Sequence, residues 1–586
     1  MRQKMKEHGV DVYYIPSSDR HLSEYVDEHF KVREFMSGFS GSAGTLVVSR
    51  KDAALFTDGR YFIQAERELE GSGIELMKMG EPETPALPDY VADLIPEGGV
   101  LGCDGKTAAT EVIVEILAKA GGKDVRAAHG RDLAGELWDA RPPLRLTKAW
   151  VLDEKETGES VLQKLTRIRK RMTETKTDLH IAGALDDIAW IFNLRGNDVK
   201  NNPVNLAYAV IAANRATLYM AEEKLTPDVA EFLRKNHVAH RDYGEFYRDL
   251  ADIAGKSVLL DKQRINYAVY TAVKENNRIV FSENPSLLMK AQKNPVELAN
   301  IREAHIRDGV ACARFHHWLK ETTRHPGSGP RLSETDVVRK LESFRKEQEG
   351  YLEPSFNTIA AAGANAAMMH YRPDPEHPVY LEPGALLLVD SGGQYRYGTT
   401  DITRTFAIGE VPVPLREHAT LVLKGMLALA DAVFLHGVTG TNLDVLARAP
   451  LWRRGIDYKS GTGHGIGFLL NVHEGPHRIA TTWNPQVLEE GMVVSDEPGV
   501  YVENSHGIRI ENELVVRKAE KNVFGQFMRF EILTFVPIDL DAVLPELLTA
   551  EEKRRLNDYH KTVFEKLSPH MTEEERKWLR EYTKEV

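Results

Sequence analysis

Four carboxylates and one imidazole in this chain have a spacing that predicts a metal site. The apolar run of residues 386–389 leads into Asp390, and a Gly-rich interval separates it from Asp401, which opens a second β-branched run. Such runs on either side of turn residues predict two antiparallel strands. With a turn at residues 395–396, Asp390 and Asp401 would lie opposite one another, about 5 Å apart. Because opposed like charges destabilise a sheet, we expect a cation between them.

A second pair of carboxylates follows the same pattern. Glu497 and Glu511 flank the polar turn of residues 503–507, and a turn centred on Asn504 places them opposite one another. A Gly-punctuated segment between the two hairpins supplies His464. Either pair alone is more typical of solvated or capping side chains. The two pairs together with His464 predict a dinuclear centre, whose oxygen-rich ligands suit Mn(II) or Co(II) better than a structural zinc ion.

The sequences around these residues resemble the pita-bread metallopeptidases, and aminopeptidase P (Xaa-Pro aminopeptidase) in particular. The resemblance rests on AAMMHYRP, DSGGQYRYGTTDITRT, GTGHGIG, NVHEGP, DEPGVY and GIRIEN, which occur in this order. It implies that Asp390 binds one metal ion and that Asp401 and Glu511 bridge both. His464 and Glu497 would then complete the other ion's ligands. It also implies hydrolysis of the bond between an N-terminal residue and a following proline, by a hydroxide shared by the two ions.

The same resemblance implies roles for residues outside the ligand set. His473 would donate a hydrogen bond to the substrate carbonyl or its tetrahedral intermediate, and His370 would assist protonation of the leaving proline nitrogen. Glu497 would accept a proton. For His370, a core or ligand-supporting histidine is the structural alternative. Three weaker candidates are Phe356 for a proline pocket, where an ordinary core position is equally plausible, Tyr501 for a hydrogen bond near the metals, and Arg509 for orienting a ligand carboxylate.

Four other histidines are assigned no catalytic role. Only its position near the motif recommends His477, so a structural role is the better interpretation. Polar histidines on a helix without facing partners are usually solvated, and this applies to His305, His316 and His317.

The amino-acid composition restricts the classes to which this protein can belong. The 586 residues are 42% hydrophobic and 28% charged, which is ordinary for a soluble globular protein, and the net charge of −12 argues against a nucleic-acid partner. No run approaches the roughly 18 apolar residues of a membrane helix. The N-terminal residues lack the apolar core of a signal peptide. Cys103 and Cys312 are far apart and predict buried thiols. We therefore expect a cytoplasmic protein with no nucleic-acid or membrane partner.

A weak internal repeat predicts a duplicated N-terminal domain. Met5, Asp11 and Asp19 align with Met172, Asp178 and Asp186 at a constant offset of 167 residues. The predicted fold is of the α/β (α+β) class, with two creatinase-like N-terminal domains before a pita-bread catalytic domain that ends in a helical extension. The predicted domains are residues 1–150, 151–291 and 292–586, with the helical extension at about 538–586.

The duplication separates the main functional hypothesis from its alternatives. The resemblance implies one such N-terminal domain in short aminopeptidases P and in prolidases, and two in long aminopeptidases P. Prolidase, which cleaves dipeptides ending in proline, shares all five ligands and is the first alternative. Creatinase and non-catalytic pita-bread proteins lack the metal ligands, so intact ligands disfavour both. The resemblance also implies a homodimer that takes peptides with proline in second position.

Overall fold

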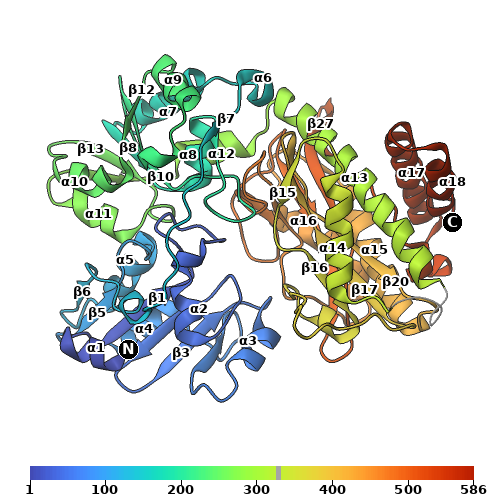
Figure 1. The fold of residues 1–586 in the computed structure, drawn as a ribbon, viewed down its shortest axis with the longest axis horizontal. Helices are drawn as coiled ribbons and strands as arrows, with labels where there is room; N and C mark the ends of the chain where they lie inside the picture. The colour runs from blue at the N-terminus through green and yellow to red at the C-terminus, as the bar shows by residue number, and fades with distance from the viewer. Residues whose placement is uncertain (325–330) are drawn as a thin grey trace. The chain divides into compact units, whose positions relative to one another are not determined.

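The structure is a computed structural model that describes residues 1–324 and 331–586. The chain divides into two compact units, Met1–Leu287 and Leu288–Val586. Figure 1 labels their helices and strands. Both units combine helices with sheets, so the predicted α/β (α+β) class is confirmed.

The first unit contains two six-stranded sheets with the same topology, ordered β4-β3-β2-β1-β5-β6 and β12-β11-β10-β8-β13-β14. In the first sheet β1 pairs antiparallel with β2 and parallel with β5. In the second sheet β8 pairs antiparallel with β10 and parallel with β13 in the same way. The first sheet consists of β1 (Val12–Pro16), β2 (Thr45–Ser49), β3 (Ala53–Thr57), β4 (Glu75–Lys78), β5 (Val100–Cys103) and β6 (Arg126–Ala128). The second consists of β8 (Leu179–Ala182), β10 (Ala207–Ala212), β11 (Ala216–Met220), β12 (Val238–Arg241), β13 (Ser257–Leu260) and β14 (Arg278–Phe281).

The repeat seen in the sequence corresponds to these two sheets. A helix precedes the first strand of each, and the two helices bury Met5 and Met172. The copies contact one another, since the amide of Tyr267 donates to the carbonyl of Ala108 at 2.8 Å. The predicted duplication is therefore confirmed. The helices of this unit are α1 (Arg2–Glu7), α2 (Val32–Ser37), α3 (Phe62–Glu68), α4 (Leu87–Leu94), α5 (Thr110–Lys119), α6 (Glu154–Thr157), α7 (Val161–Glu174), α8 (Leu185–Ile191), α9 (Pro227–Lys235), α10 (Phe246–Ala251) and α11 (Tyr267–Lys274), and α12 (Pro285–Ala291) spans the boundary.

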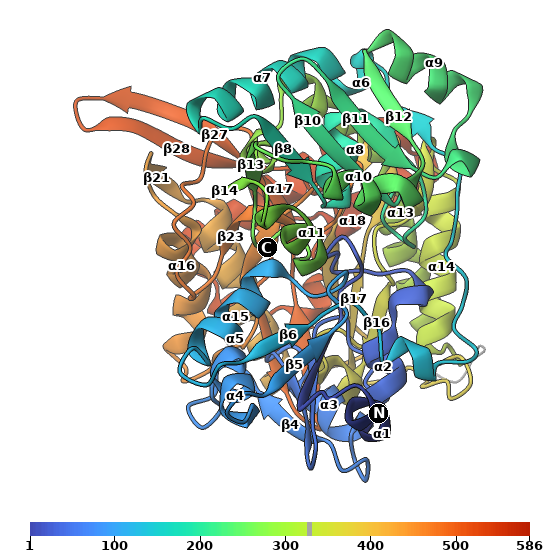
Figure 2. The ribbon, with the colours of Figure 1, turned by 90° about the vertical axis from the view of Figure 1, so that its left-hand side faces the viewer.

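The second unit combines antiparallel sheets with long helices. Its largest sheet has the order β21-β28-β27-β24-β22-β23, and smaller sheets are β16-β17-β20, β15-β18-β19 and β25-β26. Figure 2 shows the β27–β28 hairpin extending outward from its sheet. The strands not described with the site below are β15 (Tyr351–Pro354), β16 (Ile359–Ala362), β18 (Gly393–Tyr395), β19 (Gly398–Thr399), β21 (Val433–Leu435), β23 (Glu474–Ile479), β27 (Asn512–Asn522) and β28 (Gly525–Ile532).

A strong N-terminal cap starts the helix α13 (Pro295–Thr323). The Asn294 side chain accepts from the amide of Glu297, the Glu297 side chain accepts from the amide of Asn294, and proline occupies the first turn. This helix packs on α14 (Glu334–Lys346), and α15 (Val413–Ala430) packs on α16 (Gly440–Trp452). These long helices cover the sheets that carry the site residues.

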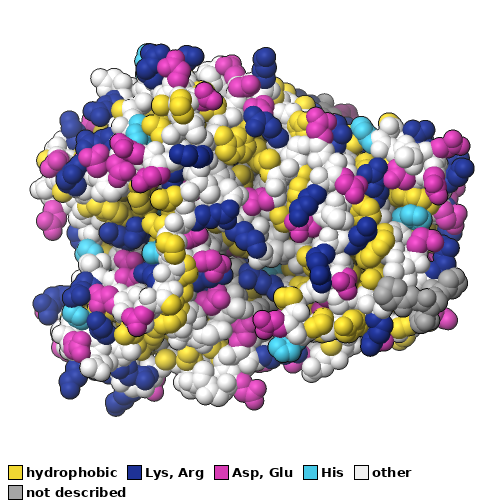
Figure 3. Space-filling view, in the orientation of Figure 1, with side chains coloured by type: hydrophobic (Ala, Val, Ile, Leu, Met, Phe, Trp, Pro, Cys, Tyr) yellow, Lys and Arg dark blue, Asp and Glu magenta, His cyan; other side chains and the backbone are white. Residues whose placement is uncertain are grey.

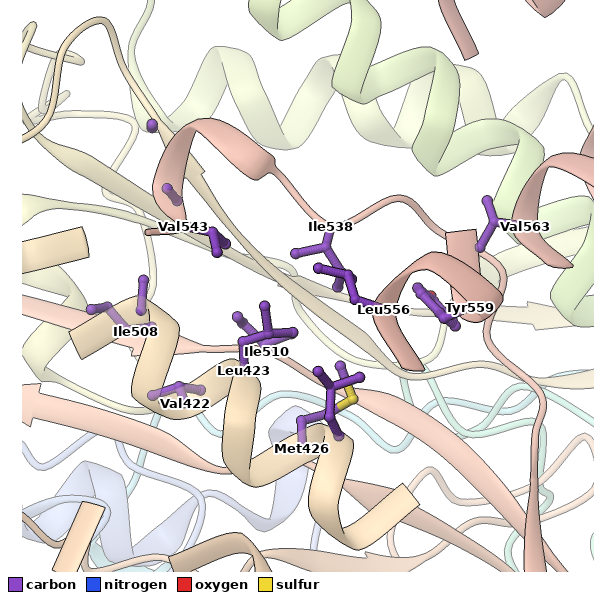
Figure 4. Close-up of a cluster of buried hydrophobic side chains, with 14 of the residues drawn as sticks. Val422, Leu423, Met426, Ile508, Ile510, Ile538, Val543, Leu556, Tyr559 and Val563 are labelled. Carbon is purple, nitrogen blue, oxygen red and sulfur yellow. The ribbon is translucent and has the colours of Figure 1, made fainter. Parts of the chain in front are cut away.

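The C-terminal extension is helical and docks onto its own unit. Thr549 caps α17 (Ala550–Leu567) and Thr572 caps α18 (Glu573–Tyr582), each through a capping box. One apolar cluster joins α17 to α15 and to the strand carrying Ile508, as Figure 4 shows. Its labelled members are Val422, Leu423, Met426, Ile508, Ile510, Ile538, Val543, Leu556, Tyr559 and Val563. The apolar residues of the extension therefore belong to the core of the second unit.

The surface mixes both signs of charge, and acidic and basic side chains are interspersed over the face drawn in Figure 3. Within the described ranges, no helix is long and apolar enough to cross a bilayer. Cys103 and Cys312 are free and buried, as predicted.

Candidate metal centre

Asp390 lies on β17 (Leu386–Ser391), and Asp401 immediately precedes β20 (Ile402–Ala407). The two strands pair antiparallel. Asp390 lies opposite Thr403, so the predicted pairing of Asp390 with Asp401 is wrong by two positions. The turn comes one residue later than predicted, because Tyr395 pairs with Gly398. A shift of two positions keeps a side chain on the same face of a sheet. Asp401 is therefore a diagonal neighbour of Asp390 on the same face.

The second pair has the predicted register. β24 (Val493–Asp496) pairs with β27, and β25 (Gly499–Val502) pairs with β26 (His506–Arg509). Both ladders are symmetric about Asn504, which has a positive φ of 59° at the turn. Glu497 and Glu511 occupy the facing positions between the two ladders, as predicted.

His464 lies on the short strand β22 (Gly463–Gly465) with its ring aimed at the carboxylates. Its Nδ1 lies 2.9 Å from the Gly465 carbonyl oxygen, to which it donates. Its Nε2 lies 3.5 Å from Asp401 Oδ2 and 3.4 Å from Glu497 Oε1. A donating Nδ1 leaves Nε2 as the nitrogen available to a metal ion.

The five predicted ligands converge into overlapping groups whose ligand atoms lie within 4.8 Å of one another. These groups are Asp390–Asp401–Glu511, His464–Glu497–Glu511 and Asp401–His464–His473. Asp401, Glu511 and His464 each belong to two groups. The two carboxylates can bridge a pair of ions through their two oxygens, whereas the Nε2 of an imidazole binds a single ion.

Burial and mutual repulsion make these carboxylates fit for cations. Burial, together with the charge of Asp390, raises the pKa of Asp401 to about 6 despite its contact with His464. Burial and the charges of Asp401 and Glu497 raise the pKa of Glu511 well above its usual value. Within the described parts of the chain, Asp390 Oδ1 and Glu511 Oε1 have no hydrogen-bond partner. Crowded carboxylates with unbonded oxygens match a site for divalent cations.

The imidazole responds to the same charges. Burial alone lowers the pKa of His464, but its contact with Asp401 and the charge of Glu497 outweigh burial and raise this pKa to about 9. Without a metal ion, His464 carries a proton on Nε2, and this N–H faces the carboxylates of Asp401 and Glu497. A bound cation would replace that proton.

Sequence reasoning missed three side chains that hold the ligands. Thr403 Oγ1 donates to Glu511 Oε2 at 2.7 Å, and Ser495 Oγ donates to Glu497 Oε1 at 3.3 Å. The amide of Asp401 donates to Glu513 Oε1 at 2.7 Å. Each of the three stands two residues from a predicted ligand. The two-residue periodicity of a strand was the signal that could have identified them.

The expectation that the histidines of α13 are solvated is wrong for two of them. His305 and His316 are fully buried. His305 Nε2 lies 3.0 Å from Glu513 Oε2, and the ring of His316 stacks on Tyr582 at 4.6 Å between centroids. The strand β27 supplies the partner of His305 and the C-terminal helix α18 supplies that of His316, and the local sequence reveals neither. His477 is also buried, with Nε2 2.7 Å from the Val493 carbonyl oxygen, which matches the structural role expected of it.

Arg509 and Tyr501 lie beside the first carboxylate pair. Arg509 is buried and pairs with Asp390 Oδ2, while its Nε donates to Thr403 Oγ1 at 3.1 Å. Its Nη1 donates to the hydroxyl of Tyr501. Arg509 therefore holds the Asp390 carboxylate, and Tyr501 holds Arg509.

The remaining candidates differ in how directly they face the cluster. The His473 ring lies 4.3 Å from that of His464 between centroids, in an edge arrangement. His370 follows the short helix η5 (Gly363–Ala367), in a segment that Arg509 contacts through the Met369 carbonyl oxygen. Phe356 is buried in the loop between β15 and β16, and its place in a proline pocket stays a prediction.

Comparisons with known proteins agree with this geometry. Residues 299–518 match metallopeptidase family M24, residues 1–130 and 140–297 each match the creatinase/prolidase N-terminal domain, and residues 526–586 match the C-terminal region of peptidase M24. Aminopeptidase P2 of Arabidopsis thaliana is 39% identical over 96% of this chain and 84% of its own length. A probable Xaa-Pro aminopeptidase P of Botryotinia fuckeliana is 39% identical over 97% and 88%. The chain belongs to the aminopeptidase P family of M24 metallopeptidases.

The solved structures support this membership and separate the chain from shorter relatives. The crystal structure of X-prolyl aminopeptidase from Caenorhabditis elegans, described as a cytosolic enzyme with a dinuclear active site, is 34% identical. It superposes with a TM-score of 0.93 over 98% of this chain and 95% of that one. An Xaa-Pro dipeptidase from Bacillus anthracis shares the fold over only 65% of this chain, with a TM-score of 0.52. The aminopeptidase P relatives therefore match the whole chain, whereas this dipeptidase matches a part.

We expect the Glu511 carboxylate to lower the free energy of unfolding of the metal-free protein at neutral pH. A carboxyl group whose folded pKa is raised contributes stability below its unfolded pKa and loses it as pH rises through the folded pKa. The Tm of metal-free Glu511→Gln should therefore exceed that of metal-free wild type at about pH 7.5, and the gap should close toward about pH 4.5, near the unfolded glutamate pKa. Thermal melts across this range measure the gap, and a gap independent of pH would contradict the expectation.

Proposed function

We propose that this protein is a dinuclear metallopeptidase that removes an N-terminal residue from peptides with proline in second position. The observation that carries the proposal is the set of overlapping ligand groups, in which Asp401, His464 and Glu511 are each shared. Relatives that match the chain along its whole length are named aminopeptidase P or Xaa-Pro aminopeptidase. Metal ions bound at this cluster would supply an activated water at neutral pH.

The ligand assignment of the proposal is the one that the family resemblance implies, and the ligand groups support it. Asp390 would bind one ion, His464 and Glu497 the other, and Asp401 and Glu511 would bridge the two. Four carboxylates and one imidazole favour Mn(II). Arg509, through its pair with Asp390, would keep that carboxylate oriented for its ion.

The chain's other side chains would handle the substrate and the protons. Glu497 would accept a proton at the cluster. His473, whose ring lies against His464, would donate a hydrogen bond to the oxygen of the scissile carbonyl. His370 would deliver a proton to the proline nitrogen as it leaves. The nitrogen needs this proton because an unprotonated amide nitrogen is too basic to leave.

We also propose three domains at residues 1–150, 151–291 and 292–586, and a cytoplasmic homodimer. The family matches at residues 1–130, 140–297 and 299–518 support these boundaries. A relative described as cytosolic supports the location. Light scattering of the purified protein tests the dimer, and a monomeric mass at micromolar concentration would contradict it.

A small substrate panel tests the activity. Arg-Pro-Pro, the dipeptide Ala-Pro and the control Ala-Ala-Ala are incubated with metal-free protein, with and without added Mn(II). We expect Mn(II)-dependent release of Arg from the tripeptide and no cleavage of Ala-Ala-Ala. Cleavage of Ala-Pro alone would move the assignment to prolidase. No cleavage of any peptide by metal-loaded protein would mean that the site serves another substrate.

A further inference from the structure

A buried carboxylate lies at the start of α14, outside the ligand cluster. Glu334 is 1% exposed and accepts hydrogen bonds through both oxygens. Its Oε1 accepts from the amide of Ala362 at 2.6 Å and from Asn365 Nδ2 at 3.2 Å. Its Oε2 accepts from the hydroxyl of Tyr371 at 2.7 Å. The first turn of a helix also favours a negative charge.

These hydrogen bonds attach the segment that carries His370 to the start of α14. Ala362, Asn365 and Tyr371 all belong to the stretch that runs from the end of β16 through η5 to the residue after His370. Asn365 Nδ2 also lies 3.0 Å from the Tyr371 hydroxyl oxygen, so the three polar groups form one network. The network ties this whole stretch to the beginning of α14.

The other side of the same segment is held by the strand that leads to Glu511. Gly507 packs so closely on the Ala366 backbone that a Cβ there would lie 1.7 Å from the Ala366 carbonyl oxygen. Arg509 Nη2 lies 3.4 Å from the Met369 carbonyl oxygen, and the same guanidinium pairs with Asp390. His370 therefore stands between one neighbour that is held from the metal cluster and one that is held from α14.

We propose that Glu334 and Tyr371 are positioning residues that hold His370 at a fixed distance from the metal cluster. The proposal rests on the proposed function, in which His370 protonates the leaving nitrogen. Proton transfer requires hydrogen-bond reach between the imidazole and that nitrogen. A displacement of about 1 Å can lower a rate by about a hundredfold. Loosening Tyr371 would let His370 move while leaving the five predicted ligands in place.

A double-mutant cycle tests the proposal, because residues that act through one another are not additive. We expect Tyr371→Phe to lower kcat on Arg-Pro-Pro by on the order of tenfold with KM and metal content unchanged. In a His370→Ala background, the same change should lower kcat by less than about twofold. Glu334→Gln should behave like Tyr371→Phe in both backgrounds. Tyr380→Phe, at a tyrosine that is 40% exposed, is the control and should leave kcat unchanged.

A second measurement does not depend on the substrate. With ring-labelled histidine, the NMR signal of His370 is assigned by its loss in His370→Ala. We expect Tyr371→Phe and Glu334→Gln to shift or broaden this signal, and Tyr380→Phe to leave it in place. An equal loss of kcat in both backgrounds, or an unchanged His370 signal, would overturn the positioning role. Absence of Xaa-Pro cleavage by wild type, with the His370 signal shifted as expected, would instead reject the proposed function alone.

Discussion

Asp401→Asn is expected to abolish peptidase activity while the fold is preserved. Asp401 belongs to two of the ligand groups, so a neutral amide at this position weakens the binding of both ions. Metal ions contribute several kcal/mol of transition-state stabilisation, and each 1.36 kcal/mol is tenfold in rate. We therefore expect kcat/KM on Arg-Pro-Pro to fall by about a thousandfold or more. Elemental analysis should find fewer than two ions per chain.

The metal-free form of the same variant should be at least as stable as metal-free wild type. Burial and the charge of Asp390 raise the pKa of Asp401 to about 6, so its ionised form is unfavourable at neutral pH without cations. Asparagine removes that charge and keeps the backbone N–H that donates to Glu513 Oε1. Thermal melts with and without Mn(II) measure both effects.

A matched control separates the ligand role from general effects of lost charge. Glu503→Gln changes an exposed glutamate in the turn of the second hairpin and should keep full activity and metal content. An Asp401→Asn protein that is active and binds two ions would exclude the bridging assignment.

Arg345→Met is expected to cause a large loss of stability in the second unit. Arg345 Nε and Nη2 donate to the Asp308 oxygens at 2.6 and 3.0 Å, and both side chains are fully buried. Removing one partner of a buried ion pair leaves an uncompensated charge, which costs about 3–5 kcal/mol of unfolding free energy. The Asp308 carboxylate also accepts from Thr400 Oγ1 at 3.0 Å, next to Asp401. We therefore expect weaker metal binding as a second effect.

Denaturation midpoints of the metal-loaded protein measure this loss. Arg339→Met, on the same helix with a side chain that is 73% exposed, is the control and should change stability by less than about 0.5 kcal/mol. Adding Asp308→Asn to Arg345→Met should restore part of the loss, because the uncompensated charge is then removed. An Arg345→Met protein as stable as the control variant would show that the pair contributes no net stability.

The same pair predicts the direction of a pH effect. Burial raises the pKa of Asp308, but the charge of Arg345 and its hydrogen bonds outweigh burial and place this pKa below its usual value. A carboxyl group with a depressed folded pKa contributes stability above its unfolded pKa and loses it as pH falls through the folded pKa. The difference in Tm between wild type and Arg345→Met should therefore shrink below about pH 4.

Local patterns in the sequence were enough to predict several features correctly. The facing positions of Glu497 and Glu511 follow from one short hairpin, in which the turn at Asn504 alone sets the register. The duplicated domain was visible because both copies keep their pattern at one offset. The hairpin register depends on interactions between residues close in the chain, and each copy of the duplicated domain carries its own local pattern.

Other features depended on contacts that the local sequence does not encode. The turn after Asp390 lies one residue later than predicted, since pairing across β17 and β20 sets its position. The burial of His305 follows from packing of α13 against Glu513 and the C-terminal helices. The contact of Glu334 with Tyr371 joins a helix start to a loop.

The sequence by itself determined the kind of chemistry, because the ligand types and their order along the chain restrict the site to oxygen-rich metal binding. Only the tertiary structure brought these ligands into one cluster. Asp390 lies on β17, Asp401 immediately precedes β20 and Glu511 immediately precedes β27, so their convergence depends on how those strands pack together. The tertiary structure also decided which side chains support the ligands, because Arg509 and Glu513 act through contacts with residues far away in the chain.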